Sequence, residues 1–336
     1  MRLSPVTILV LAFFFIVGVL ALQVGLYLFN KPDVAHEERI VDIPRGMSVA
    51  EISNLLAKKR VIESPKSFTA LVRITGQSKK IKAAEYQFFT DMPPFEVLRI
   101  LVKGVPFLRQ VTVPEGTNMA RIAKLFENAE IVSAEDFLKA AKNKTLLNSL
   151  GIKANDAEGY LFPETYYFPR KTTGEVVVKA MVNTFNETYD PKWDELAKMF
   201  NLSRQQLVTL ASIIEKETSV PKERPIISAV FHNRLKKGMR LQSDPTVIYG
   251  IKDFDGNLKK IHLTTPHPHN TYTKYGLPAG PIASPGKESL EAALFPAQVS
   301  YLYFVSKNDG SHAFSKTYKE HWRAVQKYQI RRRSSR

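Results

Sequence analysis

Residues 207–250 read LVTLASIIEKETSVPKERPIISAVFHNRLKKGMRLQSDPTVIYG. Ser203 followed by Gln206 forms a capping-box pattern, and apolar residues then recur at helical spacing, which predicts a buried helix. The last turn of this helix carries two glutamates, Glu215 and Glu217. Desolvation and the negative end of the helix dipole both favour a neutral carboxyl group at such a position. The stretch therefore predicts a buried helix that presents a candidate general acid.

The helical pattern does not choose between the two glutamates, because they fall on opposite edges of the apolar stripe. Glutamates are also common at solvated helix ends, so that alternative stays open on the pattern alone. A second helix is predicted over about residues 222–237, closed by Gly238, and the polar run Arg240–Thr246 follows it. A polar loop between two apolar segments can carry a ligand.

Several long motifs occur in one order along the chain. They are EGYLFPETY at 158–166, ASIIEKET at 211–218, FHNRLKKGMRLQSDPTVIYG at 231–250 and NTY at 270–272. Together they resemble the MltG (YceG-like) family of endolytic murein transglycosylases, and the resemblance covers nearly the whole chain. It implies a lyase that cleaves the MurNAc-GlcNAc bond of nascent peptidoglycan glycan strands and leaves a 1,6-anhydro-MurNAc end. That chemistry requires no cofactor and no metal ion.

The resemblance also favours one of the two glutamates. In lytic transglycosylases and goose-type lysozymes the acid is followed directly by a small hydroxyl residue, which Thr218 supplies after Glu217. We therefore expect Glu217 to act as general acid and then as general base. Glu215 has a supporting role in this interpretation, since its neighbour Lys216 favours the ionised form. Other expected supporting or substrate-binding residues are Gln242, Ser243, Asp244, Glu158, Tyr160, Glu164, Asn270 and Tyr272.

Two other functions remain as alternatives. A hydrolytic muramidase would use Glu217 together with a second carboxylate, Asp244, and would leave reducing ends. A non-catalytic wall-binding anchor would bind glycan without cleaving it. The formal net charge of +16 indicates an anionic partner. We expect no nucleic-acid partner, because the chain lacks a recognition motif.

The amino-terminal region predicts a membrane anchor. Residues 6–29 are apolar without a charged residue and are long enough to span a bilayer once. A cleavable signal peptide is the alternative, but the sequence has a poor cleavage site. Residues 1–5 are then a short cytoplasmic segment and residues 30–38 a linker. The resemblance implies that the catalytic domain lies in the periplasm, outside the bacterial inner membrane, where wall synthases are candidate partners.

An internal repeat organises the next part of the chain. Val41–Gly46 matches Val111–Gly116 at an offset of 70 residues, and each copy predicts a strand, a turn, two helices and a second strand. For the second strands, Ala84–Phe88 is matched with Glu158–Phe162. The first copy, residues 39–104, resembles the family's LysM-like module, which implies wall binding; a packing or spacer module is the alternative.

The expected fold class is α+β. A single N-terminal transmembrane helix precedes the LysM-like small α/β module, and a mixed α+β catalytic domain covers residues 105–330. The second copy of the repeat stands at the start of this domain. Residues 331–336 form a basic tail. The chain has no cysteine, so disulfides are excluded.

Overall fold

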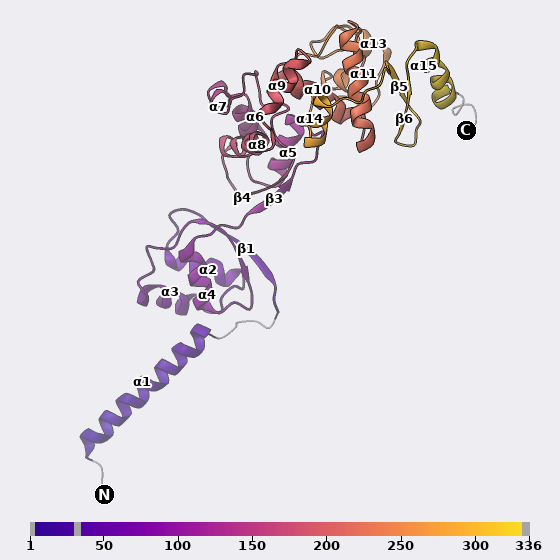
Figure 1. Ribbon diagram of the computed structural model, residues 1–336. Coiled ribbons are helices and arrows are strands. Elements are labelled where there is room, and N and C mark those ends of the chain that lie inside the picture. The colour runs from indigo at the N-terminus through magenta and orange to yellow at the C-terminus, as the bar shows by residue number, and fades with distance from the viewer. Residues whose placement is uncertain (1–3, 30–34, 331–336) are drawn as a thin grey trace. The chain divides into compact units, whose positions relative to one another are not determined.

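The computed structural model describes residues 4–29 and 35–330 (Figure 1). The basic tail and parts of the predicted cytoplasmic segment and linker lie outside the described residues. The chain divides into two compact units, one ending at Leu108 and one beginning at Arg109. Both combine helices with small antiparallel sheets, so the α+β class is confirmed.

Helix α1 (Pro5–Phe29) is long and apolar enough to cross a membrane. Its 25 residues have a mean hydropathy of 2.8 over the most apolar window, and none of that window is buried. A helix of this length spans about 37 Å, which exceeds the hydrocarbon core of a bilayer. Either a membrane anchor or a signal sequence fits these properties.

A small α/β module follows α1. Strand β1 (Glu38–Ile43) pairs antiparallel with β2 (Ala84–Phe89), and three helices complete the module: α2 (Val49–Lys58), α3 (Pro65–Ile74) and α4 (Pro94–Lys103). Ser48 and Ser64 cap α2 and α3 with their hydroxyl groups. The apolar faces of these helices and the alternate residues of the strands form one buried core.

The second unit opens with the same arrangement. Strand β3 (Arg109–Thr112) pairs antiparallel with β4 (Thr165–Phe168). The helices are α5 (Met119–Asn128), α6 (Ala134–Ala141), α7 (Lys144–Ser149) and α8 (Gly174–Thr188). Ser133 caps α6 as Ser64 caps α3.

The pairing register corrects the predicted match of the second strands. Val41 lies opposite Tyr86, and Val111 lies opposite Tyr166. Each tyrosine hydroxyl donates to the carbonyl oxygen four residues before it, at 2.8 Å in the first copy and 2.7 Å in the second. Ala84–Phe88 therefore corresponds to Glu164–Phe168 and not to Glu158–Phe162. The prediction was wrong because the second copy is ten residues longer between its second helix and its second strand, a stretch that contains α7.

The rest of the second unit is mainly helical. Its long helices are α9 (Lys192–Met199), α10 (Arg204–Glu217), α11 (Arg224–Lys236) and α14 (Lys287–Leu294). The short ones are η1 (Pro221–Glu223), α12 (Asp244–Tyr249) and α13 (Lys260–Thr264). A hairpin of β5 (Tyr303–Ser306) and β6 (His312–Ser315) precedes α15 (Tyr318–Val325) and a final π-helical turn, η2 (Gln326–Ile330).

Helix α10 lies at the centre of this unit and packs against α9, α11, α12 and α14 (Figure 1). Every residue from Leu207 to Ile214 is buried, including Thr209 and Ser212. The hydroxyl groups of these two residues donate to carbonyl oxygens of the preceding turn. Ser212 also accepts the backbone N–H of Ile282 at 3.1 Å. The helix is therefore fixed in rotation, and its carboxyl end is held at a defined position.

We predict that Gly159→Ala lowers the free energy of unfolding far more than Gly151→Ala. Both glycines have a positive φ, +83° and +79°, so both substitutions incur a left-handed strain of about 1 kcal/mol. A Cβ at Gly159 would also lie 2.5 Å from Pro281 and 2.9 Å from Val208 of α10, whereas nothing lies within 4 Å at Gly151. Overpacking adds about 1 to 3 kcal/mol. Chemical denaturation measures the free energy of unfolding of each variant. Equal decreases in the two variants would contradict the close contact of Gly159 with Pro281 and Val208.

Candidate active site at the end of helix α10

The two glutamates at the end of α10 have different surroundings. Ser203 and Gln206 form the predicted capping box at the start of the helix, so its register is set from the first turn. Glu217 is the last helical residue and lines a cleft of about 370 Å³. Glu215, two residues earlier, does not line this cleft and is held in a cluster of ion pairs. The structure thus separates two residues that helical periodicity did not distinguish.

The carboxyl group of Glu217 is held in its protonated form close to neutral pH. Its pKa is raised from 4.5 to about 7, mainly by burial and also by the nearby charge of Asp244. A hydrogen bond from the Ser243 hydroxyl to Glu217 Oε1, at 2.5 Å, and the more distant charge of Arg234 act in the opposite direction. A carboxyl group that exchanges its proton near pH 7 is suited to act first as an acid and then as a base.

Ser243 is positioned by Thr271, the central residue of the NTY motif. The Thr271 hydroxyl accepts the Ser243 N–H at 3.0 Å and is hydrogen-bonded to Thr246 Oγ1 at 2.8 Å. The Thr271 carbonyl also accepts the N–H of Gln242 at 3.2 Å. Gln242 has a φ of +51°, an uncommon left-handed conformation for a non-glycine residue. This backbone conformation turns the chain immediately before Ser243.

Asp244 lines the same cleft as Glu217. Its Oδ1 accepts a hydrogen bond of 2.6 Å from the Tyr272 hydroxyl. Burial raises the pKa of Tyr272, so this group stays protonated and donates. Gln242, Asp244 and Tyr272 therefore line one cleft with Glu217, and the carboxylate of Asp244 has a fixed donor.

A buried arginine, Arg234 of α11, forms the floor of the cleft. Its Nε donates to the Leu302 carbonyl and its Nη1 to the Leu241 carbonyl, both at 2.6 Å. The guanidinium carbon lies 5.3 Å from the centre of the Tyr303 ring. Arg234 thus joins α11 to β5 and to the segment before Ser243. Sequence reasoning missed it, because a charged residue within a helix is typical of a solvated face.

The carboxyl-terminal hairpin and α15 also line the cleft. Tyr303, Phe304 and His312 of the hairpin and Tyr318 of α15 line it. His312 lies 2.7 Å from Glu223 through Nδ1, and its backbone N–H donates to the same carboxylate at 2.9 Å. This histidine is therefore hydrogen-bonded to the protein and anchors the hairpin next to the end of α10.

Glu215 belongs to a cluster around Arg224. The Arg224 guanidinium lies 3.4 Å from Glu215 and 3.5 Å from Glu115, and it also contacts Glu288. Glu215 further accepts the backbone N–H of Gly286 at 3.0 Å. Its side chain is only 6% exposed, so its negative charge is compensated by these partners. The cluster fixes the last turn of α10 to α11 and α14, which is a structural form of the supporting role expected for Glu215.

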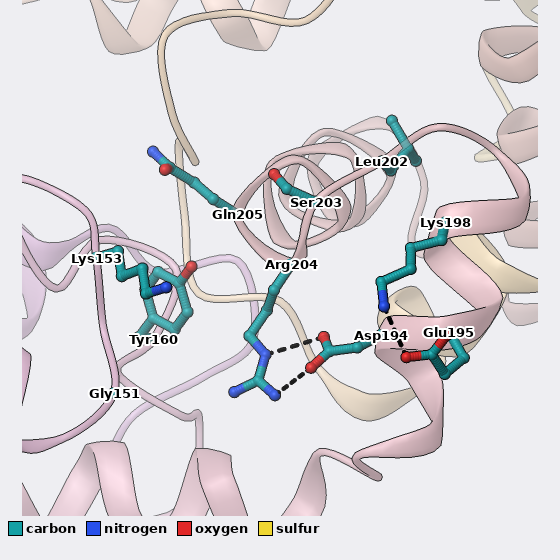
Figure 2. A pocket seen from close by; sticks show the side chains of 10 residues that line it. All are labelled: Gly151, Lys153, Tyr160, Asp194, Glu195, Lys198, Leu202, Ser203, Arg204 and Gln205. Carbon is teal, nitrogen blue, oxygen red and sulfur yellow. Dashed lines mark hydrogen bonds and ion pairs between the residues drawn. The ribbon is translucent and has the colours of Figure 1, made fainter.

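Besides Glu215 and Ser243, four more of the predicted residues do not line the cleft. Glu158 is buried and accepts the Met119 N–H and the Tyr249 hydroxyl, each at 3.0 Å. Glu164 is exposed beside β4. Asn270 is 1% exposed, and its amide donates to three carbonyls at the end of α13. Tyr160 lines a different cavity at the start of α10 (Figure 2).

The environment of Glu158 raises its pKa to about 7, mainly through burial. Its carboxyl group joins the first turn of α5 to Tyr249, the last residue of α12. Asp244 begins the same short helix, α12. Glu158 is therefore connected to the site through α12.

In the described part of the chain, no group of three or more His, Cys, Asp or Glu side chains could hold a metal ion.

Comparisons with known proteins agree with one another. The model of the YceG-like family matches residues 41–327. A protein of Bacillus subtilis (strain 168) named endolytic murein transglycosylase is 36% identical, over 86% of this chain and 84% of that protein. One of the same name from Streptococcus pneumoniae serotype 2 is 30% identical over 85% of this chain but only 57% of its own length. A crystal structure of a putative YceG-like protein from Listeria monocytogenes matches with a TM-score of 0.60 and 31% identity, over 85% of this chain and 98% of that one.

We predict that Glu217→Gln stabilises the protein at alkaline pH only. A carboxyl group with a raised pKa binds its proton more tightly in the folded state, so the free energy of unfolding falls as pH rises from 4.5 to about 7. Glutamine does not titrate but can still accept the bond from Ser243. At pH 8 the free energy of unfolding of the variant should exceed that of the native protein by about 1 to 3 kcal/mol. At pH 4 the two free energies of unfolding should be equal.

Thermal denaturation across this pH range measures the difference. Glu158 is present in both proteins, so its own titration cancels. A difference that does not vary with pH would show that Glu217 has an ordinary pKa.

Proposed function

Because this chain belongs to the YceG-like family, we propose that it is an endolytic lytic transglycosylase that acts on peptidoglycan. Glu217 is its catalytic acid and base. The observation that carries this assignment is the carboxyl group of Glu217 at the buried end of α10, with a pKa of about 7 and an opening into the cleft. Both protonation states are accessible near neutral pH, as a group with two successive proton transfers requires.

The reaction proceeds in two steps at this carboxyl group. In the first, protonated Glu217 gives its proton to the glycosidic oxygen between MurNAc and GlcNAc, and the bond from that oxygen to the muramyl anomeric carbon breaks. In the second, the Glu217 carboxylate removes the proton of the muramyl 6-hydroxyl. That oxygen then forms the new bond to the anomeric carbon and closes the 1,6-anhydro ring. Water does not take part, and one carboxyl group is sufficient.

The neighbouring residues support these steps. The Ser243 hydroxyl orients the carboxyl group of Glu217 through its hydrogen bond. Asp244, held by Tyr272, places a negative charge where positive charge develops on the sugar ring. Tyr303 and Tyr318 give the cleft aromatic surfaces on which sugar rings can stack. Gln242 lines the cleft and supplies amide hydrogen-bonding groups.

We also propose that the enzyme is anchored in the membrane and acts outside the cytoplasm. Helix α1 then crosses the bacterial inner membrane once, with the catalytic unit in the periplasm. The module that contains β1 and β2 is a LysM-like wall-binding module in this proposal. Action on nascent glycan close to the membrane makes wall synthases candidate partners.

Hydrolysis is the second candidate function, because Asp244 lines the same cleft as Glu217. A second carboxylate in that position can activate water or form a covalent intermediate. The two functions differ in product: the transglycosylase leaves 1,6-anhydro ends, and the hydrolase leaves reducing ends.

We predict that Glu217→Gln lowers the rate of glycan cleavage by about a thousandfold, since the variant cannot transfer a proton. Mass spectrometry of uncrosslinked glycan strands incubated with each protein detects 1,6-anhydro-muramyl ends directly. The matched control is Glu187→Gln, an exposed glutamate of α8, which should cleave at the native rate. Full activity of the Glu217 variant would refute its assignment, and no cleavage by the native protein would favour a wall-binding anchor.

The variant Asp244→Asn distinguishes the two reactions. If the enzyme is a transglycosylase, the rate falls by about ten- to a hundredfold because one charge that stabilises the transition state is lost, but every product still carries a 1,6-anhydro end. If the enzyme is a hydrolase, the native protein yields reducing ends and the variant yields almost no product. The ratio of the two kinds of end, measured by mass spectrometry, decides between them.

A further inference from the structure

A second cavity lies at the opposite end of α10 from Glu217. Its volume is about 600 Å³, and it is lined by the loop after α7, by α9 and by the first residues of α10 (Figure 2). The 14 residues of α10 separate it from Glu217 by about 20 Å along the helix axis. The reaction proposed for Glu217 uses none of its residues.

The charged residues of this cavity leave one cation without a partner. Arg204 is paired with Asp194 through two hydrogen bonds, of 3.0 Å and 2.5 Å, and Lys198 is paired with Glu195 at 2.7 Å (Figure 2). These pairs neutralise both acidic side chains. Lys153, on the loop after α7, also lines the cavity. Among the described residues it has no ion-pair or hydrogen-bond partner, so the cavity carries an uncompensated positive charge.

The start of α10 adds hydrogen-bond donors. Ser203 caps the helix and accepts the N–H of Gln206. The N–H groups of Arg204 and Gln205, the first two helical residues, have no acceptor within the helix, as in every α-helix. Both residues line the cavity. Such a helix start favours an anionic group but does not by itself make a binding site.

Tyr160 provides the independent observation. It is only 4% exposed and packs edge-to-face on Phe185, with 5.1 Å between ring centres. Its hydroxyl has no hydrogen-bond partner among the described residues, and because Tyr160 lines the cavity this group is free to donate to a ligand there. In Figure 2 the hydroxyl end of the ring is turned toward Lys153 and the start of α10. Burial raises the pKa of Tyr160 to about 12, so the group remains a donor.

We propose that this cavity binds a carboxylate group of a ligand. Lys153 supplies the charge, the Tyr160 hydroxyl supplies a hydrogen bond, and the first N–H groups of α10 complete the set of donors. Two sources of that carboxylate are compatible with the cavity: the carboxyl terminus of a short peptide and the lactyl group of a muramyl sugar. The choice of these sources rests on the proposed function, because stem peptides of peptidoglycan end in a carboxylate and muramyl residues without a stem peptide have a free lactyl carboxylate. The carboxylate site itself does not rest on the proposed function.

Isothermal titration calorimetry on the full-length protein in detergent micelles tests the site. The probes are N-acetyl-alanyl-alanine, the same dipeptide with an amidated carboxyl terminus, and N-acetylmuramic acid with N-acetylglucosamine as its uncharged counterpart. We expect each carboxylate probe to bind at least tenfold more tightly than its uncharged counterpart. The tighter of the two carboxylate probes identifies the source.

Two variants locate the binding. Lys153→Met and Tyr160→Phe should each weaken carboxylate binding about tenfold. Their matched controls are Lys142→Met and Tyr167→Phe, at exposed positions outside the cavity, which should bind as the native protein does. Melting temperatures verify folding, and Lys153 is an exposed side chain whose replacement leaves the core intact.

Three results would overturn the proposal: no binding of any carboxylate probe, equal binding of charged and uncharged probes, or unchanged binding in both cavity variants. The variant Glu217→Gln separates this proposal from the proposed function. It should bind the carboxylate probes normally while cleaving no glycan. A native protein that binds the probes but cleaves no glycan would leave the carboxylate site standing and refute the transglycosylase.

Discussion

The burial of α10 from Leu207 to Ile214 is the constraint on which the rest of the second unit depends. A helix that is buried on every side can take only one rotation, and here the polar residues Thr209 and Ser212 have fixed partners as well. Its last turn therefore directs Glu215 into the Arg224 cluster and Glu217 into the cleft. Desolvation at the end of such a helix also raises the pKa of Glu217. The position of the Glu217 carboxyl group and its raised pKa therefore have the same physical origin, the burial of α10.

Local patterns in the sequence predicted much of this. The capping box at Ser203, the apolar run after it and the two terminal glutamates define α10 without reference to any other segment. The second helix was predicted from about residue 222, and the structure has a short 3-10 turn there before α11 begins at Arg224. The polar run before Thr246 was predicted to carry ligand-binding residues, and Gln242 and Asp244 do line the cleft.

The remaining features depend on contacts between distant parts of the chain, which no local pattern records. Thr271 holds Ser243 across 28 positions, and Arg234 reaches the Leu302 carbonyl across 68. Thr271 was recognised only as part of the NTY motif, which does not show what the side chain holds, and Arg234 was missed because an arginine in a helix usually faces water. Glu158 and Asn270 were recognised through motif resemblance, but a motif does not show whether a polar side chain faces a ligand or its own backbone. The polar groups of both side chains form hydrogen bonds within the protein.

The ten extra residues in the second copy of the repeat show how a duplicated module can acquire new properties at small cost. The paired strands and the tyrosine that bonds four residues back are the same in both copies, so the shared core sets what the module needs in order to fold. The longer connection contains Lys153, Glu158 and Tyr160. These residues have no counterpart in the first copy. The first copy therefore serves as an internal reference: residues common to both copies report on folding, and residues confined to the insertion report on specialisation.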